Sequence, residues 1–277
     1  MSVTTKWQLD TPALCLDLDL LEANVRRMAA FFADKPAALR PHTKTHKCPT
    51  IAWMQIEAGA IGVTCAKVGE AEVMARAGIR DILIANQVVG EDKIARLMGL
   101  AAHTDVMVAV EDPANARALA EAAAARGITL RVLLEVDVGM GRCGVAPGDP
   151  ALALAREVCA LDGLRFEGLM GYEGHAVMVP DMAERARVTE QSLATLIATR
   201  DLLVENGLPV AIVSGGGTGA AGPPDPADPT AEAHVTDTAG HAGPAIGGQD
   251  IACIGCQHDG PPLTAPGTSG NDTSVIP

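Results

Sequence analysis

Short apolar runs alternate with longer segments of helical periodicity along most of the chain. The runs are rich in Val, Ile and Leu, and those at 81–85 and 130–134 are apolar at nearly every position, which is typical of strands covered on both faces. Turn residues separate the runs from the segments between them. The pattern predicts eight strands, over residues 13–18, 37–44, 62–66, 81–86, 105–110, 129–136, 165–171 and 210–214.

The segments between these strands carry Ala, Leu, Glu and Arg at helical spacing. Asp112-Pro113 is typical of a helix start, and Gly78, Gly127 and Gly207 are placed as residues just past a helix end. Because each crossover is long enough for a helix, we expect parallel strands, and the count favours an α/β fold of the (β/α)8 TIM-barrel type over an open sheet. Helices are predicted over 20–32, 49–58, 69–77, 91–101, 113–125, 150–160 and 181–206.

The pattern ends after Gly219. The last Lys or Arg is Arg200, and residues 219–277 include a single leucine, Leu263, and no aromatic side chain. Such a segment buries too little apolar surface to offset the entropy lost on ordering. We therefore expect a barrel domain over 1–219 and a disordered, Pro- and Gly-rich tail over 220–277.

Composition narrows the classes of partner. A net charge of −13 argues against nucleic acid and anionic membrane surfaces, and three Phe, two Trp and one Tyr offer few rings for stacking on bases. No apolar stretch approaches the ~18–20 residues that cross a bilayer, and the N-terminus lacks a secretory pattern. Seven irregularly spaced cysteines suit free thiols in a reducing compartment. We expect a cytoplasmic protein without a nucleic-acid or membrane partner.

Basic side chains cluster at the end of the strand predicted over 37–44. In an extended chain Arg40, His42 and Lys44 share one face, and Pro41 biases the residue before it towards an extended conformation. Neighbouring positive charge and partial burial favour the neutral, nucleophilic form of an amine. The cluster therefore indicates a Schiff-base lysine beside an anionic cofactor, or, as the alternative, an exposed basic strand end.

A run of glycines follows the last predicted strand, a position where barrel enzymes often bind phosphate. Consecutive glycines adopt positive φ readily, so that successive N–H groups can converge on one anion. The alternative is a flexible linker into the tail. The predicted phosphate site consists of Ser214, Gly215, Gly216, Gly217 and Thr218.

Two further side chains follow predicted strands. Arg142 lies among Gly139, Gly141 and Gly144, which allow a tight loop that aims one long cationic side chain inward. Opposite a pyridine nitrogen it would keep that nitrogen unprotonated. Tyr172 is the only tyrosine, and its hydroxyl could donate to a phosphate or its ring could line the pocket. The alternatives are a solvated loop arginine and a side chain on the barrel rim.

Five motifs in collinear order resemble the D-threonine aldolase and D-serine dehydratase group of the fold-type III, alanine racemase-like pyridoxal-phosphate enzymes. The resemblance covers residues 8–219, and the sequence at 137–144 is more similar to the D-threonine aldolases than to the D-serine dehydratases. The motifs are Asp-Thr-Pro-Ala-Leu at 10–14, Arg-Pro-His-x-Lys-Thr-His-Lys at 40–47, Asp-Val-Gly-Met-Gly-Arg-Cys-Gly at 137–144, Gly-Tyr-Glu-Gly-His at 171–175 and Ser-Gly-Gly-Gly-Thr at 214–218.

The resemblance implies roles for the residues singled out above. Lys44 would carry pyridoxal phosphate as a Schiff base, and Arg142 would face its pyridine nitrogen. Tyr172 and residues 214–218 would hold the phosphate. His42 would support the cofactor or shift protons.

The implied reaction is retro-aldol cleavage of a D-β-hydroxy-α-amino acid, such as D-threonine to glycine and acetaldehyde. Three alternatives stay open: a D-serine dehydratase, an inactive barrel that binds pyridoxal phosphate, and a barrel enzyme whose lysine reacts with a phosphorylated substrate. Relatives in this fold type are usually dimers with shared sites, which implies a possible homodimer.

Members of the group continue into a C-terminal β-domain that holds a divalent metal of the Mn or Zn type. Residues 220–277 do not resemble that domain, although Cys253-x-x-Cys256-x-His258 has the spacing of half a zinc site. We therefore assign no metal ligands, and we hypothesise that the gene or reading frame is disrupted near Gly219.

Overall fold

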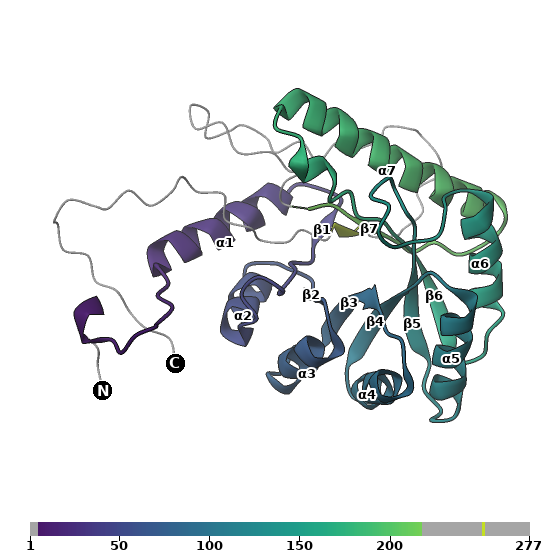
Figure 1. The fold of residues 1–277 in the computed structure, drawn as a ribbon, viewed down its shortest axis with the longest axis horizontal. Coiled ribbons are helices and arrows are strands. Elements are labelled where there is room, and N and C mark those ends of the chain that lie inside the picture. The colour runs from purple at the N-terminus through teal and green to yellow at the C-terminus, as the bar shows by residue number, and fades with distance from the viewer. Residues whose placement is uncertain (1–4, 218–250, 253–277) are drawn as a thin grey trace.

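The computed structural model describes residues 5–217 and the backbone of residues 251–252. Its centre is a parallel sheet in the order β1-β8-β7-β6-β5-β4-β3-β2 (Figure 1). The predicted strands from residue 37 onward are found within it. The strands are β1 (Ala38–Leu39), β2 (Val63–Cys65), β3 (Asp81–Gln87), β4 (Asp105–Val110), β5 (Leu130–Glu135), β6 (Leu164–Met170), β7 (Ile212–Gly215) and β8 (Ile251–Ala252).

The chain just after β1 closes the sheet against β2. Thr64 N donates to Pro41 O at 2.8 Å, and Thr43 N donates to Thr64 O at 2.8 Å. His42 forms a parallel bridge with Thr64. These contacts join the two ends of the strand order, so the sheet returns on itself, and the predicted TIM-type α/β fold is confirmed.

The helices lie on the outer face of the sheet (Figure 1). Three of them begin at an aspartate whose side chain accepts a backbone N–H of the first turn, namely Asp17, Asp112 and Asp181. All seven predicted helices are confirmed. They are α1 (Leu18–Phe32), α2 (Pro49–Glu57), α3 (Val68–Arg76), α4 (Glu91–Ala101), α5 (Pro113–Ala124), α6 (Asp149–Cys159) and α7 (Met182–Glu205), with 3₁₀ turns η1 (Lys6–Gln8) and η2 (Ala176–Met178).

Alternate strand residues divide the core into two. One set, including Ile82, Val108 and Val132, packs between the sheet and the helices. The other set, including Leu83 and Met170, forms a separate buried cluster inside the barrel. This apolar plug fills the middle of the barrel, so a ligand has access only at its ends.

Three residues at or near the beginning of a strand, Asp81, Asp105 and Arg131, form ion pairs. Asp81 opens β3 and pairs with the buried Arg40 at 2.8 Å. Arg131 of β5 pairs with Asp105 and Glu167, each at 2.8 Å. The opposite, carboxyl end of the barrel is therefore left for a functional site, as in other barrels of this type.

The strand predicted over 13–18 is wrong. Residues 13–17 have no regular structure, and Leu18 begins α1 because the Asp17 side chain accepts from Leu20 N at 3.1 Å. Within the described residues no strand pairs with this segment, and Leu14 is 99% exposed. The position that it was expected to fill is taken by β8, between β1 and β7.

The strand predicted over 37–44 is shorter than expected. β1 has two residues, and a turn begins at Thr43. The expected shared face of Arg40, His42 and Lys44 is therefore wrong for its last member, since Lys44 lies in the turn. Lys44 N donates to His42 Nδ1 at 3.2 Å, a local bond that replaces strand pairing.

The tail expected over 220–277 lies outside the described residues, apart from Ile251 and Ala252 of β8. The division into a barrel and a disordered tail therefore stays a prediction, and the sequence pattern did not indicate β8. Among the helices that the structure describes, none combines the length and the apolar character needed to cross a bilayer.

Candidate active site

Lys44 lies at the carboxyl end of the barrel in a turn held by two histidines. His42 Nδ1 accepts from the amide of Lys44, and His46 Nδ1 accepts from the amide of Cys48 at 3.0 Å. Lys47 Nζ donates to Lys44 O at 2.7 Å. The amine of Lys47 is thus used within the turn, whereas the exposed Lys44 side chain extends towards Tyr172.

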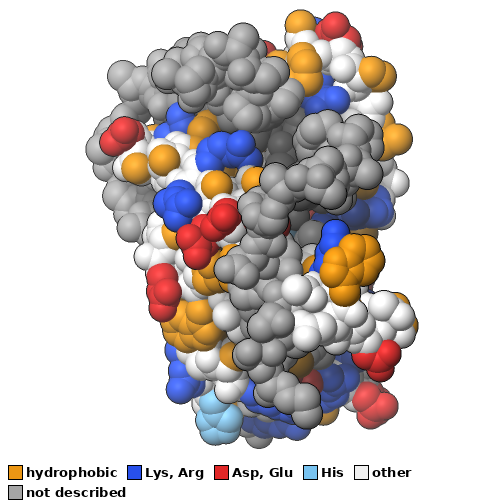
Figure 2. All heavy atoms as spheres, turned by 90° about the vertical axis from the view of Figure 1, so that its left-hand side faces the viewer, with side chains coloured by type: hydrophobic (Ala, Val, Ile, Leu, Met, Phe, Trp, Pro, Cys, Tyr) orange, Lys and Arg blue, Asp and Glu red, His pale blue; other side chains and the backbone are white. Residues whose placement is uncertain are grey.

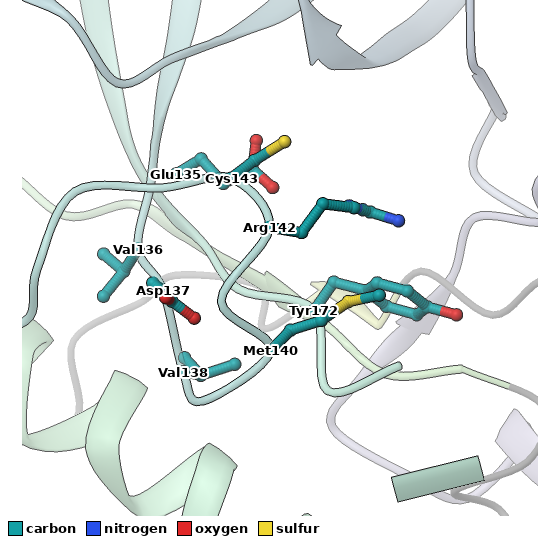
Figure 3. A pocket seen from close by; sticks show the side chains of 8 residues that line it. All are labelled: Glu135, Val136, Asp137, Val138, Met140, Arg142, Cys143 and Tyr172. Atoms are coloured by element: carbon teal, nitrogen blue, oxygen red, sulfur yellow. The ribbon is translucent and has the colours of Figure 1, made fainter. Parts of the chain in front are cut away.

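Tyr172 brings two of the predicted cationic residues together. Lys44 Nζ lies 5.6 Å from the centroid of its ring, and Arg142 Cζ lies 5.3 Å from it. Both distances are in the range of cation–π attraction. Figure 3 shows Arg142 and Tyr172 extending side by side from two loops. Residues about 100 and 130 positions from Lys44 in sequence therefore lie close to it in the fold, because barrel topology brings strand ends together.

Gly217, which follows β7, and Gly174, which follows β6, pack on the same ring. A Cβ at Gly217 would lie 3.2 Å from Tyr172 Cε2, and a Cβ at Gly174 would lie 2.3 Å from Tyr172 Cε1. Side chains at these two positions would displace the ring. Tyr172 thus contacts the predicted phosphate site as well as the two cations, while Thr218 lies outside the described residues.

Two buried polar atoms beside this glycine run have no hydrogen-bond partner in the described part of the chain. They are Ser214 Oγ and Glu173 Oε1. Buried polar groups are nearly always paired in native proteins, so atoms of this kind mark a place where a ligand or water is expected. The other Glu173 oxygen, Oε2, accepts from Gly216 N at 3.2 Å.

Carboxylates fix both ends of the loop that carries Arg142. Asp137 Oδ1 accepts from Gly139 N and Gly141 N, both at 3.0 Å, and these amides lower the pKa of its carboxyl group. Glu111 Oε2 accepts from Gly144 N at the other end. A hollow beside this loop is lined by Glu135, Val136, Asp137, Val138, Met140, Arg142, Cys143 and Tyr172 (Figure 3).

A carboxylate pair under this loop was missed in the sequence. Gln87 Nε2 donates to Glu111 Oε2 at 3.1 Å and also to Glu135 Oε2. Burial raises the pKa of Glu135, although Gln87 and Arg142 act against this shift. The available signal was position, because Glu135 ends β5 and Glu111 directly follows β4.

His42 is held neutral. Burial lowers its pKa to about 4, and the nearby Lys44 acts in the same direction. Because Nδ1 accepts the amide of Lys44, the proton of the neutral ring lies on Nε2. His42 can therefore donate a hydrogen bond from Nε2 and position the Lys44 backbone.

Within residues 5–217, no group of three or more His, Cys, Asp and Glu side chains is arranged to hold a metal ion. Cys253, Cys256 and His258 lie outside the described residues. The divalent metal implied by the resemblance stays a prediction.

Known proteins share this barrel. The alanine racemase N-terminal domain family matches residues 16–228. D-threonine aldolase of an Arthrobacter species is 43% identical over 214 residues, 77% of this chain and 56% of that protein. D-threo-3-hydroxyaspartate dehydratase of Delftia sp. is 32% identical over 211 residues, 76% of this chain and 56% of that protein. The crystal structure of D-threonine aldolase from Filomicrobium marinum gives a TM-score of 0.74 at 46% identity, covering 76% of this chain and 57% of that one.

The fold is that of a parallel α/β barrel, and Lys44 is accessible at the carboxyl end of its strands. Since the family match spans most of the sequence, the chain belongs to the alanine racemase N-terminal domain family. The resemblance to the D-threonine aldolase group is confirmed. The chain spans about half the length of the curated relatives that it matches.

Proposed function

We propose that this protein is a pyridoxal-phosphate-dependent lyase that cleaves D-β-hydroxy-α-amino acids of the D-threonine type into glycine and an aldehyde. The carrying observation is the convergence of Lys44, Arg142 and the glycine run on the ring of Tyr172. The similarity to two D-threonine aldolases supports the choice of substrate.

The residues present fit pyridoxal phosphate. This cofactor offers an aldehyde to an amine, a ring nitrogen to a polar partner and a phosphate dianion to a set of N–H and O–H donors. Lys44 supplies an exposed amine and Arg142 a permanent cation. Ser214 supplies a buried hydroxyl without a partner in the described residues, next to glycines that leave room where a Cβ would otherwise lie.

Each residue then has a defined task. When bound, pyridoxal phosphate supplies the electron sink for charge left on the substrate Cα. Lys44 would hold the cofactor through its amine, and His42 fixes the backbone from which that side chain departs. Arg142 would lie at the pyridine nitrogen and, as a guanidinium, would not give up a proton to it. Ser214 Oγ and the backbone of residues 215–217 would line the phosphate site, with the Gly216 amide held by Glu173.

Dehydration is the second candidate reaction, because D-threo-3-hydroxyaspartate dehydratase is also a relative. A lyase of that kind eliminates the β-hydroxyl group, and its product is a keto acid with ammonia. The same site residues would serve both reactions. A small-molecule D-amino acid as substrate, a Mn- or Zn-type metal, a homodimer and a cytoplasmic location complete the proposal.

The test of cofactor attachment is borohydride reduction of the purified protein with pyridoxal phosphate, followed by peptide mapping. We expect the adduct on Lys44, and Lys44→Ala should abolish both the adduct and the aldimine absorbance band. Lys47→Ala is the matched control, since its amine bonds to the turn and should not carry the adduct. An adduct on Lys47, or none in the unaltered protein, would contradict the proposal.

The same samples separate the candidate reactions. With Mn²⁺ added, we expect D-threonine to yield acetaldehyde and L-threonine to yield none. Keto acid and ammonia in place of aldehyde would identify a dehydratase. Cofactor attachment without either product would identify a binding barrel that lacks activity.

A further inference from the structure

Glu173 is a buried carboxyl group beneath the glycine run. Glu173 is 1% exposed. Its Oε2 atom accepts from Gly216 N, and its Oε1 atom has no hydrogen-bond partner among the described residues. Oε1 would lie 3.9 Å from a Cβ at Gly217. A carboxyl group next to a predicted phosphate site needs an explanation, because two negative charges repel each other.

The backbone around Glu173 is fixed from both sides. Gly171 N donates to Ser214 O at 2.9 Å, which continues the pairing of β6 with β7, and Ala176 N donates to Glu173 O at 2.9 Å. Tyr172 and Glu173 are therefore presented together to residues 215–217. Within the described residues, Glu173 forms no salt bridge.

The surroundings of Glu173 favour the neutral acid. Burial raises its pKa, and the amides of Glu173 itself, Gly216 and Gly217 and the charge on His175 act against this shift more weakly. A neutral carboxyl group accepts at one oxygen and donates from the other. It can hold the Gly216 amide without placing a second negative charge beside a phosphate.

We propose that Glu173 is a positioning residue that holds the peptides of Gly216 and Gly217 from the protein side, so that the glycine run keeps the shape in which Ser214 Oγ and its backbone receive a phosphate. Gly216 has a φ of 95°, and a hydrogen bond on its amide fixes this left-handed conformation. The ligand enters from the open mouth, where Lys44 and Arg142 are exposed, so the buried Glu173 supports the site and does not compete for it. The inference rests on the proposed function.

The test compares the binding of pyridoxal phosphate and pyridoxal, which differ only in the phosphate group. Affinities are measured on the full chain by equilibrium dialysis. Glu173→Ala should weaken pyridoxal phosphate about tenfold and leave pyridoxal within about twofold, because one hydrogen bond to the phosphate loop is lost. Glu173→Gln keeps an acceptor and a donor and should retain both affinities within about threefold.

Glu167→Ala is the matched control. Glu167 lies on β6 near the other end of the barrel, where it bonds to Arg131. Its removal should leave the ratio of the two affinities unchanged, whatever its effect on stability. If the alanine chain at 173 does not fold, Glu173→Met fills the volume without a polar group and should give the alanine result.

The outcomes separate the two claims. Equal loss of both affinities, tighter pyridoxal phosphate binding by Glu173→Ala, or a glutamine variant as weak as alanine would overturn the positioning role alone. An unaltered protein that binds neither compound would overturn the proposed function and this inference with it.

Discussion

Tyr172 contacts groups from three separate segments of the chain, namely the turn at Lys44, the loop at Arg142 and the glycines after β7. At the scale of single residues, individual contacts fix the positions of the Tyr172 ring and of the Lys44 backbone. Gly174 leaves room for the ring, and the amide of Lys44 is tied to His42. The lysine is thus positioned by its backbone, while its side chain is left exposed.

His42 gives a prediction for pH. Its pKa is about 4 in the fold against 6.5 when unfolded, so between these values the unfolded state binds more protons. The contribution of neutral His42 to stability is therefore fully present above pH 6.5 and is lost as the pH falls towards 4. Between pH 7 and 4.5 the His42 contribution to the free energy of unfolding should fall by about 2 kcal/mol.

Urea unfolding at the two pH values measures this loss, with His42→Asn as the comparison because its amide oxygen can still accept from Lys44. The asparagine chain should lose less stability on acidification than the unaltered chain. His46 also has a pKa lowered by burial, and it contributes equally in both chains. Equal losses would show that His42 does not titrate as inferred.

At the scale of elements, the loop over 137–144 is built to present Arg142. A Cβ at Gly144 would lie 2.4 Å from Asp137 N, so the two ends of the loop meet only with glycine there. Gly144→Ala should separate them, displace Arg142 and weaken pyridoxal phosphate binding by at least about tenfold, as the strain of a misplaced left-handed residue suggests.

Gly141→Ala is the control for this prediction. Gly141 also has a positive φ, of 63°, but nothing lies within 4 Å of a Cβ there. Gly141→Ala then costs only the local backbone strain of about 1 kcal/mol, and the affinity for pyridoxal phosphate should stay within about threefold. Dialysis of both variants decides the matter, and equal effects would mean that crowding at Gly144 is unimportant.

The helices and central strands could be predicted because their signals are local. Periodicity and capping residues such as Asp112 are carried by neighbours in sequence. The strand at 13–18 failed because alternation alone does not supply a pairing partner, and Asp17 caps a helix in the same place. β8 has two residues within a segment without a period, so its only signal is the pairing with β1 and β7.

The site was predictable to a similar degree. Strand-end positions indicated Lys44, Arg142 and Tyr172, since barrel topology brings such positions together. Glu111 and Glu173 were missed because their roles depend on amides of Gly144 and Gly216, which are remote in sequence. Pairings of this kind are fixed by the tertiary structure.

At the scale of the whole molecule, the barrel separates two polar ends by the apolar plug around Leu83 and Met170. One end carries the candidate site. The other carries ion pairs, of which Arg40–Asp81 links the segment after β1 to β3 across β2. The candidate site and these ion pairs therefore lie towards opposite ends of the barrel, while the backbone contacts of residues 41–43 that close it lie next to Lys44.

The Arg40–Asp81 pair is unequal in burial, which gives a prediction for its two halves. The side chain of Arg40 is 2% exposed and that of Asp81 is 34% exposed. Asp81→Ala leaves a guanidinium buried without its partner and should lower the free energy of unfolding by about 3 kcal/mol. Arg40→Met leaves a carboxylate that water can reach and fills much of the space, so it should lower the free energy of unfolding by only about 1 kcal/mol.

Urea unfolding of the two variants and of the double variant measures these two losses of stability. The double variant should be more stable than Asp81→Ala alone, because the unpaired buried charge is then gone, and a double variant that is the least stable of the three would contradict this account of barrel closure.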